Sequence, residues 1–302
     1  MNRFFWLIRR EVWEHKAIWI APSVVIACLV LLVITGNVHL GPIGTMEGND
    51  TFGAFPPDVQ QKLLLIAYAG LALVVDMVMG IIAFFYALDS LYADRRDRSV
   101  LFWKSLPLSD SETVLSKFAV AAVVIPLVSL LGAFAAQFVV AAGGSAKLAM
   151  SGMSAGIMWQ PEAIFGGMTI AFLWCITAIL WYAPVIAYLM LASAWAPKGP
   201  FLWAVLPPVA ILLLERVVLY SQYASDFIAG RLFGLYKLLG RREDGGASDA
   251  ADASAVTKLS NIDMVGSLKE FYSSPDLWLG VVAAGLLLAA AMWVRRYRDE
   301  TS

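Results

Sequence analysis

The chain has 302 residues, of which 60% are hydrophobic and only 15% are charged, and its mean hydropathy is +0.73. A soluble domain carries about 25% charged residues, so a water-soluble globule of this size could not bury so much apolar surface. The formal net charge of −1 gives no basic or acidic excess, which argues against nucleic acid as a partner. Composition therefore predicts a polytopic α-helical membrane protein.

Six apolar runs are each long enough to cross a bilayer, which takes about 20 residues. Residues 4–14, before the first run, mix aromatic and charged side chains, a pattern typical of an interfacial helix and also of a simple aromatic belt. The predicted fold is an all-α transmembrane bundle of about six helices with an amphipathic N-terminal interfacial helix. The runs occupy residues 17–36, 63–91, 115–142, 163–195, 201–220 and 276–294. Interior prolines predict bent helices at Pro22, Pro126, Pro184, Pro207 and Pro208.

Basic residues in short loops indicate which side of a membrane protein faces the cytoplasm. Most of them fall near the two termini and between the second and third spans, whereas the opposite short loops hold only Lys62 and Lys147, among acidic residues. We therefore expect a multi-pass membrane protein with both termini in the cytoplasm.

The spans divide the chain into three parts. Residues 1–220 hold spans one to five, with a cytoplasmic loop at 92–114. Residues 221–275 are predicted to form external amphipathic helices joined by a flexible tether at 243–255, whose small polar residues have little to bury. Residues 276–302 hold the sixth span and a cytoplasmic tail.

The sequence lacks the familiar motifs of nucleotide binding, metal binding and catalysis. No P-loop occurs, the only histidines, His15 and His39, flank the first span on opposite sides, and Cys28 and Cys175 each lie within an apolar run. We therefore expect a chain that is not an enzyme, with no catalytic residue, no metal site and no cofactor of its own.

Three ionisable residues stand in or near apolar spans and are candidates for a transport pathway or gate. Asp76 lies near the centre of the second span, where a carboxylate is costly, so it either serves an ion or proton role or hydrogen-bonds a neighbouring helix. Glu215 and Arg216 lie toward the outer end of the fifth span, either as an interfacial or interhelical pair or as part of a gate.

The segment between the second and third spans carries the strongest functional signal. It begins with dense charge, continues with an apolar stretch and ends at a proline, after which Ser109 and Glu112 have the spacing of a helix capping box. Docking into a groove of a partner protein accounts for aromatic residues in a charged loop, and an interfacial anchor is the alternative. The candidate coupling residues are Asp97, Arg98, Leu101, Phe102, Trp103, Lys104, Leu106 and Pro107.

This segment resembles the cytoplasmic loop of bacterial type-2 ABC exporter permeases, through Asp97-Arg98, Ser105-Leu106-Pro107-Leu108-Ser109 and the following Lys117. In that family the loop contains a coupling helix that seats on a separate cytoplasmic ATPase, and two permease subunits work with an ATPase dimer. The resemblance implies that ATP and Mg bind the partner ATPase and that this chain contacts a second permease copy and membrane lipid. It also implies a location in the bacterial cytoplasmic (inner) membrane.

The functional prediction is a permease subunit of an ATP-driven ABC exporter that forms the translocation path as a dimer. Two alternatives stay open at this point. One is an ion-coupled secondary transporter that uses Asp76, although such proteins normally show internal repeats. The other is a membrane assembly factor that transports nothing.

Overall fold

The computed structural model describes residues 3–35, 56–97, 109–150, 152, 154–240, 269 and 271–298, and this part of the chain contains helices and turns but no β-strand. The helices follow the apolar runs because a backbone in lipid must satisfy its own hydrogen bonds. In chain order they are α1 (Arg3–Glu14), α2 (Ala17–Thr35), α3 (Pro57–Arg96), α5 (Asp110–Ala119), the π-helical η2 (Val120–Val124), α6 (Ile125–Met150), the 3-10 helix η3 (Ala155–Trp159), α7 (Pro161–Trp195), α8 (Pro200–Leu214), the π-helical η4 (Glu215–Leu219), α9 (Tyr223–Gly240) and α12 (Pro275–Arg298).

Six helical stretches are long and apolar enough to cross a membrane, which confirms the predicted all-α polytopic bundle of about six helices. The helices extend beyond the apolar runs at several ends. α3, for example, covers Pro57–Arg96, whereas hydropathy marked only 63–91. The additional turns are polar, so a hydropathy window does not register them, and they carry α3 out to the charged loop.

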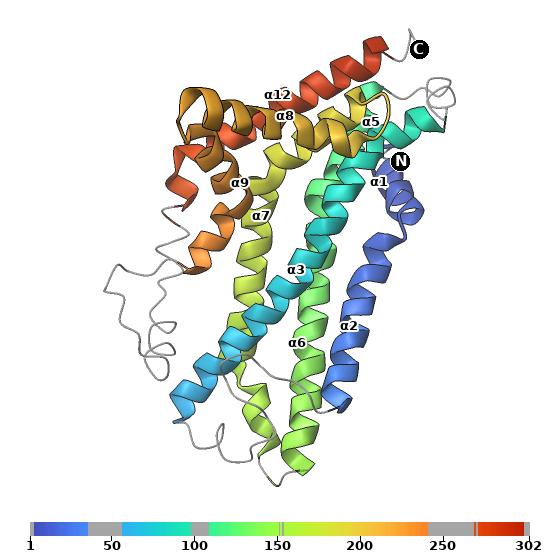
Figure 1. The fold of residues 1–302 in the computed structure, drawn as a ribbon. Helices are drawn as coiled ribbons and strands as arrows, with labels where there is room; N and C mark the ends of the chain where they lie inside the picture. The colour runs from blue at the N-terminus through green and yellow to red at the C-terminus, as the bar shows by residue number, and fades with distance from the viewer. Residues whose placement is uncertain are drawn as a thin grey trace.

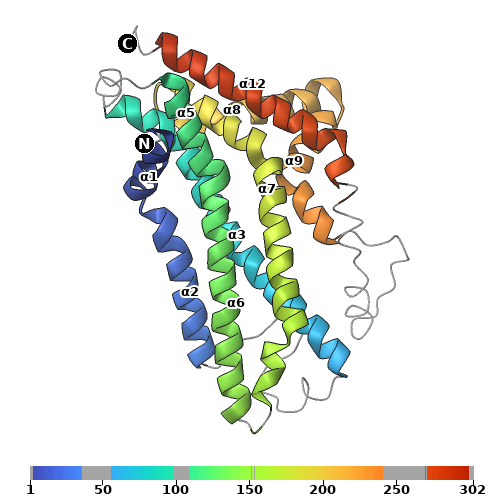
Figure 2. The ribbon, with the colours of Figure 1, turned by 180° about the vertical axis from the view of Figure 1, so that it is seen from behind.

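α3, α6 and α7 form the centre of a long bundle, and α2 packs against α6 (Figure 1). α12 crosses the upper half of α7 at a slope, and α8 lies across the end of the bundle that α7 reaches (Figures 1 and 2). Both termini lie at this same end. We call it the charged end, made of α1, residues 94–97 of α3, α5 and residues 295–298 of α12.

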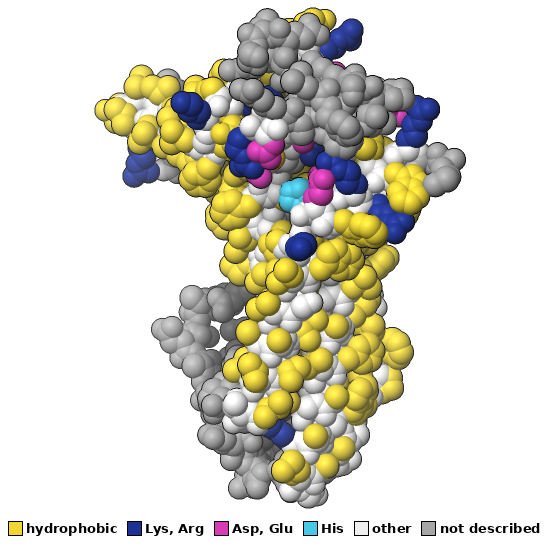
Figure 3. Space-filling model, turned by 90° about the vertical axis from the view of Figure 1, so that its right-hand side faces the viewer, with side chains coloured by type: hydrophobic (Ala, Val, Ile, Leu, Met, Phe, Trp, Pro, Cys, Tyr) yellow, Lys and Arg dark blue, Asp and Glu magenta, His cyan; other side chains and the backbone are white. Residues whose placement is uncertain are grey.

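Charge is distributed unevenly along the bundle. On the face drawn in Figure 3, Lys, Arg, Asp and Glu side chains gather at the charged end, above a long surface of hydrophobic side chains. The hydrocarbon core of a bilayer is about 30 Å thick and excludes unpaired charge, so the apolar surface fits the lipid and the charged end fits the interface.

One glycine shows how closely the helices of the bundle approach. A Cβ atom added to Gly132 of α6 would lie 3.2 Å from the side chains of both Pro22 and Val75, which belong to α2 and α3. Helices in lipid associate largely through such close packing of small residues. Gly132 therefore serves contacts within the chain, at the level where three spans meet.

Candidate functional site

The end of α3 and the start of α5 flank the segment that the sequence marks as a coupling loop. We call residues 94–97 and 109–117 together the elbow. The Ser109 hydroxyl accepts a hydrogen bond from the Glu112 N–H at 3.2 Å, and the Glu112 carboxylate accepts one from the Ser109 N–H at 2.9 Å. The predicted capping box is thus confirmed, and it begins α5 with two of its free amides satisfied.

Only one of the eight candidate coupling residues lies in the described part of the chain. Asp97 follows the last residue of α3, and its exposed carboxylate accepts a hydrogen bond from Arg96 Nε at 3.0 Å. The other seven, Arg98, Leu101, Phe102, Trp103, Lys104, Leu106 and Pro107, lie outside the described residues.

A network of five charged residues, four of them buried, joins the elbow to α1 and α12. Its centre is Lys117 of α5, whose ammonium group is 2.9 Å from Glu11 of α1 and 3.3 Å from Asp94 of α3. We call Glu11, Asp94, Asp110, Lys117 and Arg295 the charge network. Lys117, Glu11 and Asp94 are all buried, so these pairs are shielded from water and only weakly screened by salt.

Arg295 extends the charge network to the last span. From α12 its Nη1 donates to Asp94 at 2.9 Å and its Nε donates to Asp110 at 3.2 Å. Asp94 therefore binds two cations at once, one through each oxygen, with Lys117 on the first and Arg295 on the second. Four elements that are far apart in sequence, α1, α3, α5 and α12, are held together at one point.

The energetics of this arrangement follow from its burial. Moving a charge out of water costs several kcal/mol, and only close partners with good geometry offset that cost. Glu11 meets the requirement with Lys117 on one oxygen and the Tyr86 hydroxyl, at 3.1 Å, on the other. A network of this kind adds little to net stability, but removing one member leaves an uncompensated charge, so its effect is to hold the four elements in one arrangement.

The end of α3 is also attached to the end of α7. The Ser193 hydroxyl of α7 accepts from the backbone N–H of Tyr92 at 2.9 Å, and Arg95 donates to the carbonyl oxygen of Ala196 at 2.9 Å. Ser193 is fully buried. One side of the elbow is thus fixed to the central bundle, while the other side continues into α5 and α6.

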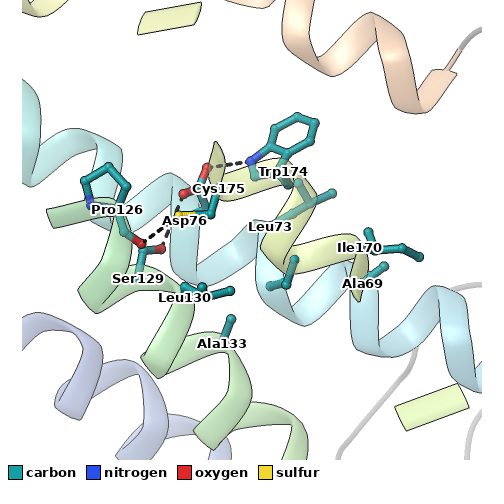
Figure 4. A pocket seen from close by; sticks show the side chains of 12 residues that line it. Ala69, Leu73, Asp76, Pro126, Ser129, Leu130, Ala133, Ile170, Trp174 and Cys175 are labelled. Carbon is teal, nitrogen blue, oxygen red and sulfur yellow. Dashed lines mark hydrogen bonds between the residues drawn. The ribbon is translucent and has the colours of Figure 1, made fainter. Parts of the chain in front are cut away.

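Asp76 lies in a pocket in the middle of the bundle. It stands near the midpoint of α3, and its two carboxylate oxygens accept hydrogen bonds from Trp174 Nε1 of α7 at 2.9 Å and from the Ser129 hydroxyl of α6 at 3.3 Å (Figure 4). The remaining lining is apolar apart from the thiol of Cys175 and comprises Ala69, Ala72, Leu73, Pro126, Leu130, Ala133, Ile170, Ala171 and Cys175. The sequence identified Asp76, and the structure adds its two partners.

Glu215 and Arg216 have separate surroundings. The buried Glu215 carboxylate accepts hydrogen bonds from the backbone N–H groups of Ala224 at 2.8 Å and Ser225 at 3.0 Å, at the beginning of α9. The Ser221 hydroxyl donates to it at 3.0 Å. Glu215 therefore caps α9, and among the described residues no ion pair joins it to Arg216, which is exposed. The role of the two residues in a gate stays a prediction.

Glu215→Ala is expected to loosen the first turn of α9 by about 1–2 kcal/mol, since a lost N-terminal cap leaves helix amides without acceptors. Hydrogen exchange at Ala224 and Ser225 should then accelerate roughly tenfold, because about 1.4 kcal/mol corresponds to a factor of ten. Arg216→Ala is the matched control and should leave these amides unchanged. Equal exchange in the two variants would show that the carboxylate does not hold α9.

Sequence reasoning missed the charge network as a unit. It counted Lys117 and Arg295 as basic residues on the cytoplasmic side, and it assigned Glu11 to an interfacial helix. The available signal was that several acidic residues, Asp94 and Asp110 among them, lie at the ends of spans on the side rich in Lys and Arg. Their pairing depends on which helix ends meet in space, which hydropathy does not show.

Six candidate spans, an amphipathic first helix and a charged end with a capped elbow define a polytopic membrane protein with a mostly apolar pocket around one carboxylate. Residues 63–182 match the family described as ABC-2 family transporter protein. The matched region runs from α3 into α7 and includes the elbow and the Asp76 pocket, and it supports an ABC-2 family permease, a membrane transport component. The predicted family is confirmed. Comparisons with curated proteins and with solved structures find no match.

Proposed function

We propose that this chain is the permease subunit of an ATP-driven exporter in the bacterial cytoplasmic membrane. Two copies form the path across the bilayer, and a separate cytoplasmic ATPase dimer, which binds ATP and Mg, drives them. The chain itself binds no nucleotide and contributes no catalytic residue. The family match supports the transport role, and the dimer and the ATPase follow from the resemblance to type-2 exporters.

The distribution of basic residues supports a cytoplasmic location for the charged end. The described Lys and Arg residues at that end include Arg3, Arg9, Arg10, Lys16, Arg95, Arg96, Lys117, Arg295 and Arg296. The opposite ends of α3, α6 and α7 hold Lys62 and Lys147, with Asp58 and Glu162. Because basic residues are retained on the cytoplasmic side, the charged end faces the cytoplasm, where an ATPase is available.

The charge network is the observation that carries the proposal. A segment that receives force from a partner must be attached to the helices it moves, and the charge network attaches the elbow to α1 and α12 through Lys117 and Arg295. A loop that served only as a membrane anchor would need no such buried attachment. Displacement of the elbow by an ATPase therefore reaches the first amphipathic helix and the last span together.

The helical segment that follows the elbow contains a site where it can bend. Between α5 and α6 the chain forms the π-helical turn η2, Val120–Val124, and Pro126 follows two residues later. π-Bulges and prolines are the usual places where a helix bends, and π-bulges are frequent at functional sites. Displacement of the elbow by the ATPase is therefore expected to bend α6 relative to α5 rather than to move the whole bundle.

Substitutions in the coupling loop test the docking assignment. Arg98→Glu and Trp103→Ala are each expected to weaken binding of the ATPase subunit at least about tenfold, since buried aromatic and Arg anchors carry most of the energy of an interface. Binding is measured with the purified chain in lipid nanodiscs and a P-loop ATPase subunit that copurifies with it, and coupled transport is measured in proteoliposomes.

The matched controls are Lys198→Glu and Trp293→Ala, which change an exposed basic residue and an exposed tryptophan elsewhere. Both controls should bind the ATPase as the unchanged protein does. Wild-type ATPase binding and transport in Arg98→Glu and Trp103→Ala would contradict the proposal.

A further inference from the structure

The Asp76 pocket has a second feature beyond its carboxylate: it opens to the surface of the chain. Asp76 and Trp174 are both partly exposed, although they lie at the level of the membrane-spanning parts of α3 and α7. We propose that this pocket binds the primary ammonium group of an amphipathic organic compound, and that such amines are the class of substrate the chain transports. The inference rests on the proposed function as a permease, and it names the substrate class.

The first step of the argument is the charge balance of the pocket. Among the described residues no Lys, Arg or His forms an ion pair with Asp76, and its hydrogen-bond partners are the neutral donors Trp174 and Ser129. A carboxylate offers about four acceptor positions, so these two donors leave acceptor capacity for a further donor. In an apolar environment a bound cation is the partner that most effectively stabilises a carboxylate.

The second step is the kind of cation. Around Asp76 the lining offers one carboxylate and one hydroxyl, and within the described part of the chain no group of three His, Cys, Asp or Glu side chains is placed to hold a metal ion. Hard metal ions require about six oxygen ligands, which this lining does not supply. An ammonium group instead needs a few directed acceptors and an apolar surface for the body attached to it. The alanine and leucine residues of the pocket provide that surface.

The third step is the connection between the pocket and the elbow. Asp76 and Asp94 lie on the same helix, α3, eighteen residues apart, which is about five turns and places them on one face. Their partners Ser129 and Lys117 lie on the continuous helical segment from α5 to α6, on either side of η2 and Pro126. The same two helices thus meet at the charge network and at the pocket. A bend at η2 would move Ser129 relative to Asp76 and change the pocket.

The test measures binding to the full chain in phosphatidylcholine nanodiscs without any ATPase, by equilibrium dialysis of radiolabelled hexylammonium and of hexanol as its neutral analogue. Zwitterionic lipid avoids attraction of the cation to the membrane itself. The unchanged protein should bind hexylammonium at least about tenfold more tightly than hexanol, in line with a desolvated charge pair. Asp76→Asn should abolish this preference, and Asp76→Glu should retain most of it.

Two further variants keep the test decisive. Ser129→Ala should weaken hexylammonium binding about threefold, because it removes the hydrogen bond that orients the Asp76 carboxylate. Asp58→Asn, which removes an exposed acidic residue of the same helix, should have no effect. Equal binding of hexylammonium and hexanol by the unchanged protein would overturn the proposal. So would an unaltered preference in Asp76→Asn, or complete displacement of hexylammonium by millimolar Na⁺, which would assign the pocket to an inorganic ion. None of these outcomes depends on docking of the ATPase, so the proposed function is tested separately.

Discussion

Lys117→Met is expected to lower the free energy of unfolding by about 3–5 kcal/mol, the loss typical of a buried ion pair that is broken by removal of one partner. Methionine retains an unbranched apolar stem, so packing changes little and the effect comes from charge. Without Lys117, Glu11 keeps the Tyr86 hydroxyl at 3.1 Å and the His15 imidazole at 4.0 Å, and Asp94 keeps Arg295. Thermal unfolding in detergent micelles should show a midpoint lower by about 10 °C or more.

A double variant separates charge from packing in this prediction. Glu11→Gln removes the carboxylate that Lys117→Met leaves unpaired, so the double variant should recover a substantial part of the lost stability, as expected for residues in direct contact. Lys198→Met is the matched control, because Lys198 is exposed, and it should change the midpoint by no more than about 1–2 °C. Additive losses in the double variant would show that Glu11 and Lys117 are energetically independent.

Much of the fold is readable from the sequence because the bilayer restricts it. An apolar run of about 20 residues must be a helix in lipid, so the six apolar runs predict six candidate spans. The capping box of Ser109 and Glu112 predicts where α5 begins. The first helix, α1, also lies where aromatic and charged residues alternate. The predicted helix over the first part of the external segment corresponds to α9, and the second lies mostly outside the described residues.

The placement of α9 was less predictable. Trp181 of α7 donates to the carbonyl oxygen of Arg231 at 2.9 Å, so α9 packs beside the middle of α7. Amphipathic spacing indicates that a helix has an apolar face but does not indicate what covers that face. Here the indole of Trp181 and the guanidinium of Arg231, 4.3 Å from its ring, form part of the contact. The external position of residues 221–275 stays a prediction.

The site was predictable only one residue at a time. Asp76 was recognisable because a carboxylate within an apolar run is rare, yet its partners Ser129 and Trp174 lie 53 and 98 positions along the chain and resemble ordinary residues of their spans. Glu215 was recognisable for the same reason, but its role as a cap depends on the turn at Tyr220, a residue with a positive φ of 49°. A polar residue within an apolar run can be recognised from the sequence alone. Its hydrogen-bond partners can be identified only once the packing of the helices is known.

Arg295→Met is expected to detach the last span from the elbow and to cost about 2–5 kcal/mol, as does truncation of one partner of a buried, hydrogen-bonded charge pair. The substitution removes both bonds of the guanidinium, to Asp94 and to Asp110, while Lys117 still joins Asp94 to Glu11. The link from α1 to α3 and α5 thus remains, and only α12 is released. Hydrogen exchange in the last turns of α12 should increase, and transport per ATP hydrolysed should fall about tenfold in proteoliposomes while the ATPase still binds.

Two variants of neighbouring chemistry decide whether this effect belongs to the charge network. Arg296→Met removes an exposed guanidinium one position along and should leave transport intact, because among the described residues no ion pair joins Arg296 to Asp94 or Asp110. Arg295→Lys keeps the positive charge but cannot donate to Asp94 and Asp110 from two nitrogens of one planar group. Relative to Arg295→Met, it should therefore recover more of the stability than of the coupling between transport and ATP hydrolysis. If Arg295→Met destabilised the protein but left the ratio of transport to ATP hydrolysis unchanged, the charge network would be a structural clamp only, and force from the elbow would have to reach α12 through the apolar contacts of α7.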